Sequence, residues 1–383
     1  MKTDGLKLGF GCMHLPLTDP ADTTAIDMAE LTRMVDMFLE RGFTYFDVAS
    51  TYHDGHCEPA IRRTLVERYP RESYTLTDKL PTLLVESPEH QERIFAEQLE
   101  RCGVEYFDRY LVHCATRAFY DRAEELGSFE FVRRMKHEGK VRLTGFSYHD
   151  SPELLDEILT EYPFVDFVQL QISYVDWELT PIQAQRCYET ARRHGKSVVA
   201  MCPQKGGLLV EVPHAVERMF RAARPDDTPS MWALRFAASL HGVTTVLSGM
   251  SSLADMESNT ALMRDFRPMD DAEREIAAKA AGMIVHAEPI QCTACGYCVP
   301  TCPEDIRIPS YLLLYNADNE AGHVEFAARL HAYESQAEGH GRASSCIECR
   351  NCEAACPQHI RIVDWLKRVT EVFETDTKAA LSI

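Results

Sequence analysis

Eight of the chain's 14 cysteines lie in two tight groups after residue 290, with the spacing C-x2-C-x2-C-x3-C-P. The groups are CTACGYCVPTCP (292–303) and CIECRNCEAACP (346–357). Three thiolates spaced in this way can hold three irons of a [4Fe-4S] cluster, while the fourth cysteine of each run reaches the other cluster. The spacing therefore predicts two [4Fe-4S] clusters. The predicted ligands are Cys292, Cys295, Cys298 and Cys356 for one cluster, and Cys346, Cys349, Cys352 and Cys302 for the other.

Two structural zinc sites are the competing interpretation of these cysteines. Zinc usually takes paired ligands and has no need for four cysteines within eleven residues, so the spacing favours iron and sulfide. A chain kept in a reducing compartment more often uses clustered cysteines as metal ligands than as disulfides. The other six cysteines are most simply core residues; they are Cys12, Cys57, Cys102, Cys114, Cys187 and Cys202.

Four residues that suit carbonyl chemistry lie at the ends of consecutive predicted strands. Asp47 ends the second strand, and Tyr52 follows it. Lys79 ends the third strand, and His113 ends the fourth. Hydride delivery to a carbonyl carbon leaves an alkoxide that must be protonated, and Tyr52 is the predicted acid. We expect the Lys79 ammonium, held by Asp47, to lower the tyrosine pKa from about 10. His113 would orient the substrate oxygen or relay the proton.

The elements that must position these residues are eight short β-rich runs that alternate with amphipathic helical stretches up to about residue 285. The runs cover residues 8–14, 43–48, 74–80, 108–114, 141–147, 167–173, 197–203 and 244–250. Eight such units predict a closed (β/α)8 barrel, in which active sites lie where the strands end. A doubly wound open sheet is the alternative, but no GxGxxG follows the first strand.

Predicted helix starts and a change in the residue pattern after residue 286 indicate two domains. A hydroxyl before a first-turn proline marks predicted helix starts at Ser87, Ser151, Thr180 and Thr228. After residue 286 strand-like runs disappear, and the cysteine groups flank a helical insert (310–336) of the kind found in α-helical ferredoxins. We therefore predict a barrel over 1–285 and a ferredoxin-like domain over 286–383.

The barrel motifs resemble those of the aldo-keto reductases, and the whole chain resembles the branch of that family fused to a ferredoxin domain. FDVASTY (46–52) is similar to the family's FDTAxxY, and GKVRLTGFS (139–147) is similar to its fifth-strand motif. The resemblance implies that Ser147 and Gln169 hold the amide of a nicotinamide. It also implies that Gly249, Ser251 and Asn259 hold the adenosine half of that cofactor.

This sequence departs from the family pattern at the cofactor site. Met201 stands where many members stack an aromatic ring on the nicotinamide, and Tyr148 replaces the usual asparagine after Ser147. Residues 248–259 contain no Lys or Arg, which a 2′-phosphate normally needs. Either NADH or NADPH is compatible with the family, and this composition favours NADH.

Three functions follow as hypotheses. The leading one is an iron-sulfur oxidoreductase that reduces a carbonyl substrate, or reversibly oxidises an alcohol, with electrons from NAD(P)H, the clusters or both. Hydride transfer moves two electrons whereas a cluster moves one, so the second hypothesis is a ferredoxin-driven, nicotinamide-independent reductase. The third is a non-catalytic electron carrier.

Charge and hydropathy limit the partners. The net charge of −19 argues against nucleic acid and against an anionic membrane surface, whereas a ferredoxin or another redox protein is a compatible partner. No stretch reaches the roughly 18 apolar residues of a membrane span, and we expect a cytoplasmic protein. Histidines near strand ends are expected to line the pocket, and a metal there is the less favoured reading; they are His14, His53, His56 and His149.

Overall fold

Eight parallel strands close into a barrel in sequence order, and β8 pairs back onto β1. The computed structural model describes residues 6–20, 22–287, 290–321 and 326–375. The strands are β1 (Leu8–Gly11), β2 (Tyr45–Asp47), β3 (Thr75–Leu80), β4 (Phe107–Ala115), β5 (Val141–Tyr148), β6 (Phe167–Gln171), β7 (Ser197–Met201) and β8 (Val243–Ser248). Each overlaps one of the eight predicted runs, so the predicted (β/α)8 barrel is confirmed.

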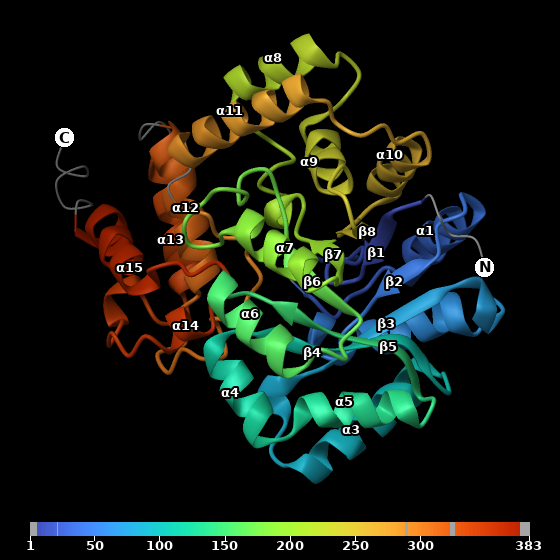
Figure 1. The fold of residues 1–383 in the computed structure, drawn as a ribbon. Helices are drawn as coiled ribbons and strands as arrows, with labels where there is room; N and C mark the ends of the chain where they lie inside the picture. Colours follow the sequence, from blue (N-terminus) through green and yellow to red (C-terminus); the bar gives the residue numbers. More distant parts are fainter. Residues whose placement is uncertain (1–5, 21, 288–289, 322–325, 376–383) are drawn as a thin grey trace.

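Helices surround the strands, as Figure 1 shows, because parallel neighbours need a crossover connection. The helices of the barrel are α1 (Met28–Glu40), α2 (Cys57–Ile61), α3 (Pro88–Cys102), α4 (Arg117–Glu125), α5 (Ser128–His137), α6 (Pro152–Glu161), α7 (Ala184–Arg193), α8 (His214–Ala223), α9 (Pro229–Ala238), α10 (Leu253–Arg264) and α11 (Asp271–Ala287). Two 3-10 turns follow strands at the mouth, η1 (Tyr52–Gly55) after β2 and η5 (Lys205–Gly207) after β7.

Three of the four predicted helix starts are confirmed. Ser87, Ser151 and Thr228 cap α3, α6 and α9 by accepting a hydrogen bond from the N–H three residues later. The start at Thr180 is wrong, because α7 begins at Ala184. The preceding loop folds back there, and its backbone carbonyls accept the first N–H groups of the helix, so no capping hydroxyl is needed.

Side chains fill the inside of the barrel below the mouth. The inner cluster consists of Tyr45, Leu111, Phe167, Val199, Met201 and Leu247. Gly145 lets β5 pass close to β6, since a Cβ at this position would lie 2.5 Å from the Phe167 carbonyl oxygen. A packed interior leaves the carboxyl-terminal mouth of the barrel as the place for chemistry.

The C-terminal part is helical in its described residues and has its own core. Its helices are α12 (Ile308–Ala321), α13 (Phe326–Ala337), α14 (Asn351–Ala354) and α15 (Ile362–Thr370), and they lie together on one side of the barrel in Figure 1. Tyr333 packs on Tyr311 and Phe373, with ring centroids 4.7 and 5.2 Å apart. The predicted boundary after residue 285 falls in the last turn of α11.

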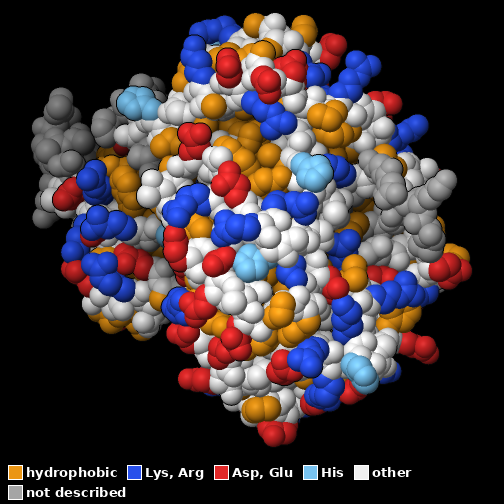
Figure 2. Space-filling model, viewed as in Figure 1, with side chains coloured by type: hydrophobic (Ala, Val, Ile, Leu, Met, Phe, Trp, Pro, Cys, Tyr) orange, Lys and Arg blue, Asp and Glu red, His pale blue; other side chains and the backbone are white. Residues whose placement is uncertain are grey.

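This C-terminal part covers the mouth of the barrel. Its residues Tyr297, Gln358 and His359 contact residues at the ends of β4, β6 and β5, respectively. On the face drawn in Figure 2, acidic and basic side chains are interspersed rather than segregated. Across the described ranges, every helix is too short or too polar to cross a bilayer.

Candidate active site

The four predicted catalytic residues meet at the mouth of the barrel. Lys79 Nζ donates to Asp47 Oδ1 at 2.6 Å and to the Val48 carbonyl at 2.7 Å. The same ammonium lies 4.6 Å from the centroid of the Tyr52 ring. The His113 ring stands edge-on to that of Tyr52, at 6.3 Å between centroids. All four side chains are buried, because they come from β2, β3, β4 and the turn η1 that packs over them.

Burial determines the proton affinities of this group. It raises the pKa of Tyr52 well above its usual value, and the Asp47 carboxylate adds to the rise. The expected lowering is therefore wrong, because desolvation of the phenolate and the Asp47 charge dominate. Burial and the Lys79 charge also hold the pKa of His113 well below its usual range. At neutral pH Tyr52 keeps its proton and His113 is uncharged.

Tyr297, a residue that the sequence did not single out, completes the group from the C-terminal part. Its hydroxyl lies 3.4 Å from His113 Nε2, and its ring is edge-on to the imidazole at 6.3 Å. It stands between the cysteines Cys295 and Cys298 of the first motif. An aromatic hydroxyl inside a cysteine motif was the only signal in the sequence. The cluster loop and the tetrad are thus in direct contact.

A large open pocket joins the tetrad to the first cysteine loop. Tyr52 lines it from the barrel, and Cys295, Gly296 and Tyr297 line it from the C-terminal part. Two of the four histidines expected in the pocket line it; they are His14 and His53. One pocket thus borders both Tyr52 and the first cysteine loop.

The five residues expected to hold a nicotinamide cofactor are divided by the structure. Gly249, Ser251 and Asn259 line the pocket. Ser147 and Gln169 are instead buried at 1% and 3% exposure and are not among the described residues that line it. Gln169 Oε1 has no hydrogen-bond partner within the described part of the chain, and its amide nitrogen lies 3.7 Å from Met201 Sδ. The three residues expected at the adenosine half thus line the pocket, whereas the two expected at the nicotinamide amide lie beneath its surface.

The eight motif cysteines gather at two cavities. Four of them line one cavity, Cys292, Cys295, Cys298 and Cys356, and four line the other, Cys302, Cys346, Cys349 and Cys352. Each cavity thus takes three cysteines from one motif and the last cysteine of the other motif. Apolar side chains complete both cavities, among them Leu312 at the first and Leu366 at the second. Four thiols around an apolar hollow fit a [4Fe-4S] cluster.

The first cavity is tied to the barrel. Gln358, which lines it, exchanges two hydrogen bonds with Gln171 at the end of β6, at 2.9 and 2.8 Å. Thr293 lines it as well and packs on Gly206, where a Cβ would lie 2.5 Å from the Thr293 carbonyl oxygen. The described residues that line both cavities belong to the C-terminal part, but none of those that line the second forms a hydrogen bond with the barrel. The first cavity therefore lies at the interface and the second away from it.

Most of the scattered cysteines lie in the core as expected. Cys12, Cys57, Cys102 and Cys187 are buried, whereas Cys202 is partly exposed and faces the first cysteine loop. Cys114 lies in β4, and its side chain is outside the described part of the structure. Cys202 still packs against the inner cluster of the barrel, so it borders the core.

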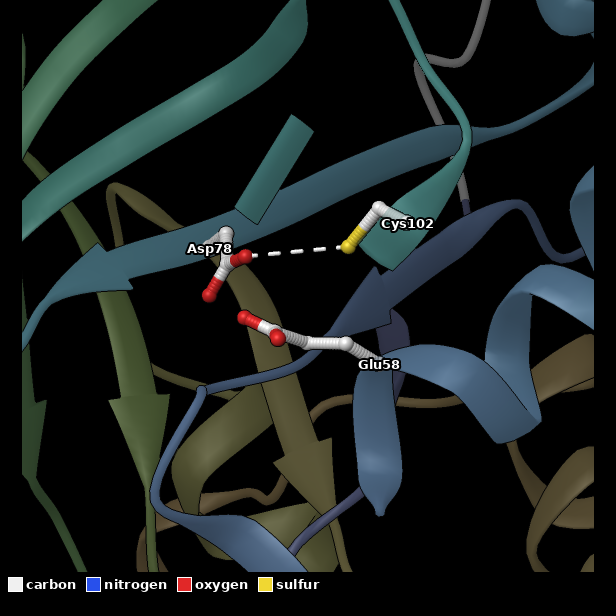
Figure 3. Close-up of side chains that lie close together, drawn as sticks. All are labelled: Glu58, Asp78 and Cys102. Atoms are coloured by element: carbon white, nitrogen blue, oxygen red, sulfur yellow. Dashed lines mark hydrogen bonds between the residues drawn. The ribbon is translucent and has the colours of Figure 1, made fainter. Parts of the chain in front are cut away.

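A buried acidic group stands apart from the pocket. Asp78 alternates with Lys79 along β3 and so points out of the barrel, where it meets Glu58 and Cys102 (Figure 3). Burial and the Glu58 charge raise the pKa of Asp78 well above its usual range, which indicates a proton shared between the carboxyl groups. The Arg101 guanidinium pairs with Glu58. A proton and an arginine thus satisfy this group without a metal ion.

Comparison with known proteins agrees with this architecture. Residues 7–280 match the aldo/keto reductase family, and residues 291–361 match a 4Fe-4S dicluster domain. An aldo-keto reductase of Mycolicibacterium vanbaalenii is 28% identical over 234 residues, which are 60% of this chain and 77% of that protein.

Solved structures with the same barrel include the aldo-keto reductase AKR11C1 of Bacillus halodurans in its holo form, with a TM-score of 0.59 at 23% identity over 73% of this chain and 96% of that one. A Klebsiella pneumoniae aldo-keto reductase in complex with NADPH has a TM-score of 0.54 at 19% identity, over 71% of this chain and 90% of that one. At these identities the likenesses show the fold alone. The chain belongs to the aldo/keto reductase family and carries a C-terminal 4Fe-4S dicluster domain.

Proposed function

We propose that the protein is an iron-sulfur oxidoreductase that reduces a small carbonyl substrate, or reversibly oxidises the alcohol, in the pocket at the mouth of the barrel. The observation that carries the proposal is that Tyr52 and Cys295 line the same pocket. Substrate, acid and cluster loop would then meet in one place. The barrel (1–285) would supply the acid–base groups, and the ferredoxin-like domain (286–383) would supply the clusters.

Tyr52 is the proposed acid and base. Its hydroxyl keeps its proton at neutral pH and gives it to the alkoxide that forms when the carbonyl carbon is reduced. An alkoxide is a far stronger base than a phenolate, so the transfer is downhill even from a tyrosine with a raised pKa. Lys79, held by Asp47, then stabilises the phenolate across the 4.6 Å to the ring. Neutral His113 orients the substrate oxygen through Nε2.

The eight motif cysteines are the proposed ligands of two [4Fe-4S] clusters, each taking the four cysteines that line its cavity. A bound cluster supplies or accepts one electron at a time. Two clusters therefore match the two electrons that separate a carbonyl from an alcohol. The two protons that this route also needs go to the oxygen, from Tyr52, and to the carbon, from solvent that reaches the open pocket. The first cavity, which adjoins the pocket, is the proposed exit to the substrate. The second, where Cys349 is exposed, is the proposed entry.

A dinucleotide would lie along Gly249, Ser251 and Asn259, with Ser147 and Gln169 at its amide. When bound, a nicotinamide supplies both electrons as a hydride. The Asp255 carboxylate lines the same part of the pocket and accepts from the backbone N–H of Ser251 at 3.2 Å. A 2′-phosphate would be repelled there, so we propose NADH over NADPH. Arg221 also lines the pocket, but Glu217 pairs with it.

One observation favours a second function, a nicotinamide-independent reductase driven by a ferredoxin. The two residues expected at the nicotinamide amide are buried beneath the pocket surface, while the cysteine loop reaches the tetrad. In this second function a reduced ferredoxin or a similar one-electron carrier is the partner.

An anaerobic titration separates the two routes. The protein is purified under argon, and iron and sulfide are counted; about eight of each per chain are expected for two cubane clusters. NADH, NADPH and reduced ferredoxin are then added separately while the visible absorbance of the clusters is followed. Bleaching by NADH supports the nicotinamide route, and bleaching by ferredoxin alone supports the second function. Two zinc ions per chain would refute both.

A variant tests the acid. Tyr52→Phe removes the proposed proton donor, so turnover of a carbonyl substrate is expected to fall by about 10²- to 10⁴-fold. Tyr74→Phe is the matched control, because Tyr74 is also buried and its hydroxyl has no partner among the described residues. Full activity in Tyr52→Phe would remove Tyr52 from the mechanism.

A further inference from the structure

A buried lysine–aspartate pair lies in the barrel wall beside the first cavity. Lys205, in η5 directly after β7, and Asp176, in the loop after β6, are both at 0% exposure. Two charges in the interior are costly to desolvate even when they are paired. A pair in this position therefore calls for an explanation beyond packing.

The two charges of the pair face different parts of the molecule. Asp176 accepts hydrogen bonds from Ser173 Oγ at 2.8 Å and from Gln171 Nε2 at 3.0 Å, both of which belong to the barrel. Lys205 Nζ donates to Asp176 and, at 3.2 Å, to Gln358 Oε1 of the C-terminal part. The negative end is thus fixed in the barrel, and the positive end faces the cysteine loops.

The positive end lies at the wall of the first cavity. Gln358 lines that cavity and comes two residues after Cys356. At the second cavity, Arg350 pairs with Glu353, but the Arg350 side chain is 55% exposed, so solvent screens its charge.

We propose that Lys205 and Asp176 set the reduction potential of the cluster in the first cavity, Lys205 raising it and Asp176 lowering it. The inference rests on the proposed function, which places a [4Fe-4S] cluster there. One-electron reduction, by dithionite or by a one-electron carrier, adds one negative charge to the cluster and releases no other group. An ammonium close by in a medium of low dielectric stabilises that added charge, and a carboxylate destabilises it.

The two single variants are therefore expected to act in opposite directions. Lys205→Met removes the positive charge and shifts the potential of one cluster to a more negative value. Asp176→Asn keeps the lysine and the shape of the pair, and shifts the same potential to a more positive value. The second cluster keeps its potential in both variants. Lys136→Met is the matched control, since Lys136 is paired with Asp166 on the barrel and lines neither cavity.

The measurement is an anaerobic potentiometric titration of the full chain, with each cluster followed by electron paramagnetic resonance. Opposite shifts in the potential of one cluster support the inference. If the pair were merely structural, its loss would shift that potential in the same direction in both variants. If Lys205→Met does not fold, the positive shift in Asp176→Asn alone carries the test. Unmoved potentials, or shifts of the same sign, with both clusters at full occupancy would overturn this inference alone. Absence of iron and sulfide from the wild-type protein would overturn the proposed function as well.

Discussion

Replacing Lys79 with methionine tests the electrostatic core of the tetrad. In the wild type the Lys79 ammonium and the Asp47 carboxylate form a pair with side chains only 0% and 3% exposed. Asp47 Oδ2 has no hydrogen-bond partner among the described residues, so Lys79→Met leaves the whole carboxylate without a hydrogen-bond donor among them. Removing one partner of a buried pair costs about 3–5 kcal/mol, and we expect the upper half of that range.

The reverse change is milder. In Asp47→Asn, the ammonium keeps the Val48 carbonyl at 2.7 Å and gains a neutral amide oxygen, so about 1–3 kcal/mol is expected. The double variant holds no unpaired charge. It should be less destabilised than the sum of the single variants, with a coupling of about 2 kcal/mol.

Equilibrium urea unfolding of the holoprotein under argon, followed by far-ultraviolet circular dichroism, measures all four members of this cycle. Because the slope against denaturant depends on the surface exposed, the four proteins should share one slope and differ in midpoint. A loss of less than about 1 kcal/mol in Lys79→Met, or full additivity in the double variant, would refute the argument for a tightly coupled buried pair.

Three further predictions concern packing, pH and the acidic group. Gly206→Ala places a Cβ against the cysteine loop and should loosen that loop to limited proteolysis, whereas Gly207→Ala, also at positive φ but with nothing within 4 Å, should not. Burial lowers the pKa of His149 to about 4, so below pH 6.5 the folded state binds fewer protons than the unfolded state. The free energy of unfolding should therefore fall by about 1 kcal/mol between pH 6.5 and 5.5. His149→Asn should remove this part of the pH dependence. Asp78→Asn should change the unfolding free energy by less than about 1 kcal/mol, because the raised pKa of Asp78 keeps its carboxyl group protonated. Glu58→Gln removes the buried carboxylate partner of Arg101 and leaves it the exposed Glu97, so it should cost at least about 2 kcal/mol; equal effects of the two variants would contradict the shared proton.

The fold could be predicted because its signals are local. Each barrel strand is a short apolar run followed by a polar residue at the mouth, and periodicity along the chain is enough to find it. The helix start at Thr180 failed for a reason of another kind. Its hydroxyl and proline are ordinary start signals, but the loop before α7 folds back and supplies backbone carbonyls to the helix. The Thr-Pro dipeptide does not specify the conformation of that loop.

The pKa of Tyr52 is likewise a property that local sequence signals do not determine. The residue types in the tetrad are correct for proton transfer, and Lys79 does lie beside the ring. Whether the ammonium or the burial prevails depends on how deeply the hydroxyl is enclosed, and burial prevails here. Depth is a property of the packed barrel and of the cysteine loop laid over it.

The sequence by itself determined the barrel, the dicluster motifs and the four polar residues at consecutive strand ends, because strand periodicity, cysteine spacing and strand-end residues are encoded within short segments. Only the tertiary structure decided how the two parts meet. Tyr297 reaches His113 across 184 positions of sequence, and Lys205 reaches Gln358 across 153. Such contacts depend on the docking of one packed surface on another, and no local pattern of residue types specifies which side chains that docking brings together.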